Sequence, residues 1–172
     1  MDLAAQKRRV SEGVDARSAA LDRLALEIHE HPELAFEERF AAEGLTKLLG
    51  SEKVDVRRGV GGLETAFVAE AGAGEPVVAI LGEYDALPGL GHACGHNLMG
   101  TAAVGAFLAL RDVADGMRGR IRIVISVVVP AARWHFANRI HAVLKKPPEF
   151  LGTMRSAWKS ASHPDDCNEV RR

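Results

Sequence analysis

Apolar residues recur every three or four positions between residues 18 and 30 and again between residues 37 and 49. This spacing is typical of amphipathic helices. Pro32 follows the first segment and Gly50 follows the second, and both residue types are common just beyond a helix. Residues 98–110 are apolar and rich in glycine and alanine, which predicts a third, buried helix.

Other apolar segments predict strands. Residues 76–81 are continuously apolar and β-branched, which is typical of a strand buried on both faces. Residues 63–70 and 120–129 also read as strands, and the glycine-rich residues 72–75 predict a hairpin turn leading into the strand at Val77. Alternation of helices and strands predicts an α/β fold in which helices flank a layered sheet.

The stretch between the apolar strand and the buried helix concentrates metal-binding chemistry. Residues 81–98 read Leu-Gly-Glu-Tyr-Asp-Ala-Leu-Pro-Gly-Leu-Gly-His-Ala-Cys-Gly-His-Asn-Leu. Open α/β sheets usually bind ligands where a strand ends and a helix begins. His92, Cys94 and His96 alternate with small residues, so an extended backbone would direct all three side chains to one side. A thiolate with imidazole suits zinc or a similar divalent metal, and this stretch is therefore a candidate metal site.

Two segments together resemble a known family. Residues 82–88 read Gly-Glu-Tyr-Asp-Ala-Leu-Pro, and residues 91–97 read Gly-His-Ala-Cys-Gly-His-Asn. They resemble the signature of the amidohydrolase branch of the aminoacylase and carboxypeptidase G zinc metallopeptidase family, particularly its aminobenzoyl-glutamate hydrolases and β-alanyl-lysine-type dipeptidases. Upstream, residues 28–38 include His-Pro-Glu-Leu and resemble the segment between the first two helices of that family.

The resemblance covers roughly residues 15–130 and implies roles for individual residues. Cys94 and His96 would bind metal, and Asp85 would serve catalysis by orienting a ligand, whereas His92 is not a ligand in the family. An orienting carboxylate is physically sensible, because metal-bound imidazoles usually donate their second N–H to such a group. The position of Glu83 suits the mouth of the site and the solvated end of a strand equally well.

The family also implies an activity. Its members hold two divalent ions, zinc or manganese, and hydrolyse an amide bond of a small N-acyl amino acid or dipeptide, while a glutamate acts as general base. That glutamate belongs to a Pro-Ala-Glu-Glu motif after a later strand. Here Pro130 and Ala131 are followed by Ala132 and Arg133, so both carboxylates are missing. We therefore expect this chain to have little or no turnover.

The resemblance is lost after residue 130. We expect residues 1–130 to form the amino-terminal part of a metallopeptidase catalytic domain. Residues 131–172 are expected to be a divergent tail, either frameshifted or disordered. His163 precedes a proline at about the position of another metal-binding histidine of the family, which makes it a third candidate ligand. A solvent-exposed histidine in a turn is an equally good interpretation of His163.

The composition limits the kinds of partner that we expect this chain to bind. The chain has 172 residues, of which 47% are hydrophobic, enough for one sizeable core. Its 22 basic and 23 acidic residues nearly cancel, so neither nucleic acid nor a membrane is expected as a partner. Full-length members of the family form homodimers through a domain for which this chain has no room. Cys94 and Cys167 are the only cysteines. A bridge between them would remove the proposed ligand, so we expect a free Cys94 in a reducing compartment, with the cytoplasm as the default location.

Three functional interpretations remain. In the first, the chain is all or part of a metal-dependent amidohydrolase or dipeptidase. In the second, it is a catalytically inactive metal-binding or interaction fragment. In the third, Cys94 is a nucleophile with His92 or His96 as its base. The match to a metal-ligand motif favours the first two.

Overall fold

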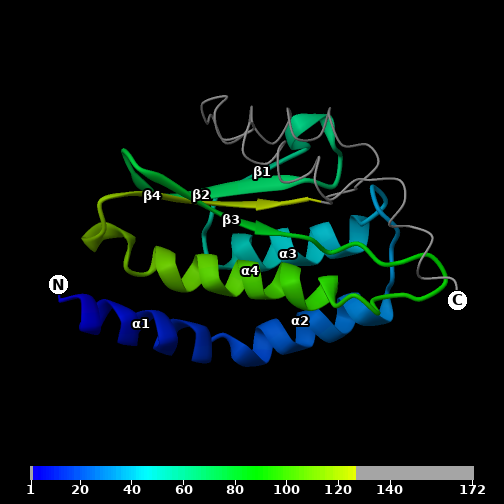
Figure 1. The fold of residues 1–172 in the computed structure, drawn as a ribbon, viewed down its shortest axis with the longest axis horizontal. Coiled ribbons are helices and arrows are strands. Elements are labelled where there is room, and N and C mark those ends of the chain that lie inside the picture. Colours follow the sequence, from blue (N-terminus) through cyan, green and yellow to red (C-terminus); the bar gives the residue numbers. More distant parts are fainter. Residues whose placement is uncertain (1, 127–172) are drawn as a thin grey trace, which may run out of the picture. The chain divides into compact units, whose positions relative to one another are not determined.

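The computed structural model describes residues 2–126, and the structural statements below refer to these residues. They form an α/β fold, as the sequence predicts (Figure 1). The helices and strands in chain order are α1 (Leu3–Asp15), α2 (Ser18–Glu30), α3 (Arg39–Ser51), β1 (Val56–Arg58), β2 (Phe67–Ala73), β3 (Val77–Gly82), α4 (His96–Arg111) and β4 (Gly119–Ile125). Short 3₁₀ turns occupy Val60–Gly62 and Ala114–Gly116.

The described strands form a four-stranded mixed sheet in the order β1-β2-β4-β3. β2 pairs antiparallel with both β1 and β4, whereas β3 runs parallel to β4. Parallel neighbours need a long crossover, which α4 supplies between β3 and β4. The predicted hairpin at residues 72–75 is therefore wrong. The two strands that flank this turn do not pair with each other, because β4 lies between them.

The helices lie on one side of the sheet (Figure 1). α4 packs against β3 and β4, α3 packs against α4 and contacts β1, and α1 and α2 pack on α4. The core forms between helices and sheet, and Ile28, Leu45, Phe67, Phe107 and Ile123 are all fully buried there. Apolar side chains on the facing surfaces of the two layers therefore hold the domain together.

The strand at residues 76–81 is present as β3, but the prediction that it is buried on both faces is wrong. Among the described residues, β3 is an edge strand of the sheet. Val78 and Leu81 remain 59% and 54% exposed. A continuous apolar run indicates that a strand can be buried on both faces. It does not show that other parts of the described chain cover those faces.

The predicted helices at 18–30, 37–49 and 98–110 are confirmed as α2, α3 and α4, with shifts of a few residues at their ends. α1 was not predicted. It buries none of its residues, and its sequence contains only three large apolar side chains, those of Leu3, Val10 and Val14. Its local signal is Asp2, whose side chain accepts a hydrogen bond from the Ala4 amide at the start of the helix. None of the helices in residues 2–126 is both long enough and apolar enough to cross a membrane.

A cluster of charges joins the ends of three helices. Arg17, which precedes α2, donates two hydrogen bonds to the Glu52 carboxylate after α3, at 3.1 and 3.0 Å. Arg111 at the end of α4 donates to the same carboxylate at 3.1 Å. Arg17 and Arg111 hold the pKa of Glu52 below its ordinary value, although partial burial opposes this effect. The ionised carboxylate therefore stabilises this arrangement of helices.

We expect the stability of the domain to depend on ionised Glu52. Because the folded protein holds the pKa of Glu52 below its ordinary value of 4.5, this contribution is complete above about pH 4.5. It is lost as the pH falls through the lower, folded-state pKa. Glu52→Gln should lower the free energy of unfolding at pH 7 by about 1–2 kcal/mol. The variant should also lose less stability than the wild type on acidification.

Urea unfolding from pH 3 to pH 7 measures both effects. The exposed Glu30→Gln serves as control, and parallel pH curves for wild type and Glu52→Gln would contradict this account.

Candidate metal centre

The chain leaves β3 through three residues whose side chains have different surroundings. Glu83 and Asp85 are partly buried, with side chains 21% and 15% exposed, whereas Tyr84 between them is completely buried. This is the period-two alternation of extended backbone, in which alternate side chains lie on opposite sides. The two carboxylates therefore face a common site while the tyrosine enters the core.

His96, the first residue of α4, lies between these carboxylates. Its Nδ1 atom is 2.8 Å from an oxygen of Asp85, and its Nε2 atom is 3.1 Å from an oxygen of Glu83. A neutral imidazole carries one N–H, so it can donate to only one of the two carboxylates. The other contact needs an added proton or a cation between the two groups.

The electrostatics of the site also favour a cation. Burial raises the pKa of Glu83, the neighbouring Asp85 adds to this effect, and His96 opposes it. Ionised Glu83 is therefore costly here without a positive partner. Donor atoms of Glu83, Asp85 and His96 all lie within 4.8 Å of one another, which is close enough to share one metal ion. Carboxylate oxygen and imidazole nitrogen are both common ligands of divalent metals, so the residues fit such an ion.

Glycines allow the helix to approach the strand at this point. A Cβ atom on Gly100 of α4 would lie 2.9 Å from the Glu83 carbonyl oxygen and 3.3 Å from the Tyr84 Cβ atom. A Cβ on Gly82 would lie 2.9 Å from the Ala103 Cβ atom. The close approach that these glycines permit holds the first turn of α4, and with it His96, beside the end of β3.

The remaining residues of the signature lie in a turn. Gly91 and Gly95 both have positive φ angles, so the segment is not the extended strand that would align His92, Cys94 and His96 on one side. Cys94 is exposed, and His92 is buried with its ring 6.2 Å from that of His29. Burial, together with His29, lowers the pKa of His92 and favours its neutral form. The role of Cys94 as a metal ligand stays a prediction.

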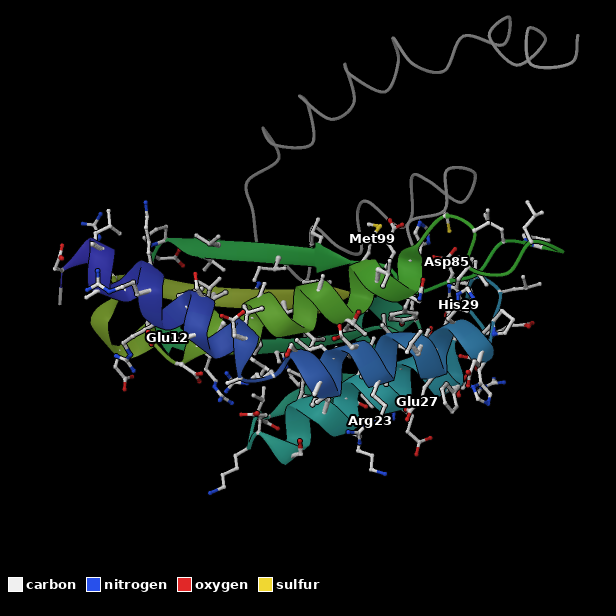
Figure 2. All side chains as sticks on the ribbon, turned by 90° about the horizontal axis from the view of Figure 1, so that it is seen from below. Glu12, Arg23, Glu27, His29, Asp85 and Met99 are labelled. Atoms are coloured by element: carbon white, nitrogen blue, oxygen red, sulfur yellow. The ribbon has the colours of Figure 1, made fainter. Side chains whose placement is uncertain are left out.

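The structure brings His96 together with Asp85, both of which the sequence selected, and adds Glu83, whose role the sequence left open. The sequence does contain a signal for Glu83. It alternates with Asp85 on either side of Tyr84, which places both carboxylates on the same side of an extended backbone. Figure 2 shows Asp85, His29 and Met99 at one end of the helices and sheet, whereas Glu12 on α1 lies at the other. His163, Ala132 and Arg133 lie outside the described residues.

Comparison with known proteins shows which family the chain resembles. No family model matches the chain. A p-aminobenzoyl-glutamate hydrolase protein of Escherichia coli is 39% identical over 134 residues, which cover 67% of this chain and 28% of that protein. The Xaa-Arg dipeptidase of mouse is 43% identical over 121 residues, covering 64% of this chain and 28% of the dipeptidase.

A solved structure from Bacillus subtilis, described as a dinuclear metal binding peptidase from the M20 family, superposes with a TM-score of 0.59 at 28% identity. The match covers 64% of this chain and 35% of that one. The matched part of the chain belongs to the M20 amidohydrolase and peptidase family. The chain thus spans just over a quarter of the length of the two M20 relatives named above.

The close contact between Gly100 of α4 and the end of β3 can be tested by adding one methyl group. Gly100→Ala should force α4 away from the end of β3 and lower the free energy of unfolding by about 1–3 kcal/mol, because the neighbouring atoms are backbone and a buried Cβ. Gly50→Ala on α3 is the matched control, since its Cβ would meet nothing within 4 Å. Chemical denaturation measures both variants. Equal stability of the two variants would show that the close approach of helix and strand is not needed.

Proposed function

We propose that this chain carries part of the active site of a metal-dependent amidohydrolase or dipeptidase. The proposed site binds a divalent metal through Glu83 and His96, with Asp85 holding the His96 ring and Cys94 as a further ligand. The observation that carries the proposal is the placement of His96 between two partly buried carboxylates, at 2.8 and 3.1 Å. Zinc and manganese are the metals proposed.

Each side chain has a distinct task in this site. Asp85 accepts a hydrogen bond from His96 Nδ1 and so leaves Nε2 free to bind metal. Glu83 supplies negative charge on the opposite side of the ring. A bound divalent ion would polarise the amide carbonyl and lower the pKa of a water molecule.

The substrate class follows from the relatives. Their names describe hydrolysis of p-aminobenzoyl-glutamate and of Xaa-Arg dipeptides, in which an amide bond joins two small units. We therefore propose a small N-acyl amino acid or dipeptide as substrate. The cytoplasm is the proposed location, in keeping with a free thiol at Cys94.

A second candidate function is supported by a specific feature of the sequence. Ala132 and Arg133 stand where the family resemblance places two glutamates, one of which is the general base. We propose that residues 1–130 form the amino-terminal part of a catalytic domain and that the sequence diverges from the family after them. On this basis the 172-residue chain binds metal but turns over slowly, and an inactive metal-binding or interaction protein is the alternative.

Metal binding tests the site directly. The purified chain should bind Zn²⁺ or Mn²⁺ in stoichiometric amounts by isothermal titration calorimetry. His96→Gln should weaken binding by on the order of 100-fold, because it removes the imidazole between the carboxylates. Cys94→Ser should also weaken binding if the thiolate is a ligand. His31→Gln is the control, since His31 is an exposed histidine that contacts the Glu27 carbonyl near the end of α2. Unchanged affinity in His96→Gln would overturn the proposed site.

Turnover distinguishes the two candidate functions. We expect little or no hydrolysis of dipeptides and N-acyl amino acids by the 172-residue chain with added Mn²⁺ or Zn²⁺, because the general base is missing. Product formation can be followed by chromatography, with a chelator as control. Robust, chelator-sensitive hydrolysis would show that the chain needs no glutamate at positions 132 and 133. Hydrolysis that persists without metal and is lost on alkylation of Cys94 would instead support a thiol nucleophile.

A further inference from the structure

A carboxylate is completely buried beside the proposed metal centre but is not part of it. Glu38 has no exposed surface, and burial raises its pKa. One of its oxygens accepts a hydrogen bond from the Phe36 amide at 2.6 Å, and the other accepts one from the Thr65 hydroxyl at 2.7 Å. A buried carboxylate with a donor on each oxygen serves to hold both donors in place.

The contact at Thr65 continues towards the metal centre. The Tyr84 hydroxyl donates a hydrogen bond of 2.7 Å to the Thr65 carbonyl oxygen, and both residues are buried. The Tyr84 ring stacks on Phe67, with ring centroids 6.4 Å apart and planes inclined by 6°. A hydrogen-bonded chain therefore runs from Glu38 through Thr65 to Tyr84.

Tyr84 is the residue between Glu83 and Asp85. Because neighbouring side chains on extended backbone point to opposite sides, anchoring the tyrosine in the core determines where the two carboxylates point. We propose that the chain Glu38–Thr65–Tyr84 is a positioning device that holds Glu83 and Asp85 in the orientation needed to bind metal. This inference rests on the metal site proposed above, and it assigns a role to three residues that do not touch the metal.

A second connection reaches the same segment from the other side. The Glu33 carboxylate accepts hydrogen bonds from the Phe40 and Ala41 amides at 2.9 and 3.0 Å, at the start of α3. The Glu33 carbonyl oxygen accepts a bond from the Ala86 amide at 2.7 Å. The segment from Glu33 to Glu38 is thus joined to the chain on both sides of Asp85, through Ala86 and through Tyr84. This explains physically why two motifs distant in sequence occur together.

Positioning predicts an effect on metal binding that a merely structural role does not. A ligand carboxylate that can rotate must lose that freedom when metal binds, so a looser Tyr84 weakens affinity even in a folded protein. Tyr84→Phe keeps the ring and its stacking and removes only the hydroxyl. Thr65→Val removes the bond to Glu38, whereas Thr65→Ser keeps a hydroxyl in the same place.

The experiment measures Zn²⁺ affinity by competition with a chromophoric chelator and records the visible absorption spectrum of the Co²⁺-loaded protein. Tyr84→Phe and Thr65→Val should each weaken Zn²⁺ binding by about tenfold, as loss of groups that orient ligands usually does. Both should also shift the Co²⁺ bands, because the ligand geometry changes. Thr65→Ser should match the wild type in both measurements.

Ile123→Val is the control for stability, because it trims a fully buried core residue on β4. It should lower the melting temperature and leave affinity and spectrum unchanged.

Wild-type affinity and spectrum in Tyr84→Phe would overturn the positioning role while leaving the metal site intact. Loss of affinity in Ile123→Val to the same extent would also overturn it. A wild-type protein that binds no Zn²⁺ would instead overturn the proposed metal site, and the positioning role with it. If Thr65→Val does not fold, the comparison of Tyr84→Phe with wild type decides.

Discussion

The close packing of α4 against the end of β3 is the constraint on which the rest of the site depends. The strand ends at Gly82, the helix begins at His96, and Gly100 one turn later faces the carbonyl oxygen of Glu83 and the Cβ atom of Tyr84. Any side chain at Gly100 would separate the two elements and draw His96 away from the carboxylates. The apolar core beneath supplies the attraction, and the glycines determine how closely the backbones approach.

This packing brings together groups that would repel or be strongly hydrated elsewhere. Two carboxylates lie on either side of one imidazole, and burial raises the pKa of Glu83. The arrangement is costly when empty of positive charge and favourable around a cation. The surrounding structure holds it by other means, through the buried hydroxyl of Tyr84 and the backbone contact between Glu33 and Ala86. These contacts therefore hold the side chains of the candidate metal site in place.

Local patterns in the sequence predicted most of the elements, because each of the predicted helices buries apolar residues in the core between the helices and the sheet. The patterns failed where the answer depended on distant parts of the chain. β3 is apolar enough for burial on both faces, yet Val78 and Leu81 stay exposed because the helices of the described chain cover only one face of the sheet. The hairpin expected at residues 72–75 is absent because β4 lies between the flanking strands.

The candidate site likewise combines features that the local sequence predicts with features that depend on distant parts of the chain. A short and specific motif points to His96 and Asp85, and the structure places these two side chains in contact. The place of Glu83 could not be decided, because it depends on the burial of Tyr84 and on the approach of a helix that begins 13 residues later. Alternation along residues 92–96 suggested a shared direction for three side chains, but the positive φ angles at Gly91 and Gly95 turn the backbone instead. Spacing predicts direction only where the backbone conformation is known.

The central claim is that His96 and Glu83 hold a metal ion at the end of β3, with Asp85 orienting the His96 ring. X-ray absorption spectroscopy of the zinc-loaded chain tests it most directly, because imidazole produces a distinctive multiple-scattering pattern. We predict nitrogen and oxygen ligands at about 2.0–2.2 Å, a sulfur ligand from Cys94 at about 2.3 Å, and an imidazole contribution that disappears in His96→Gln. A zinc spectrum that contains only sulfur ligands, or one that His96→Gln leaves unchanged, would contradict the account.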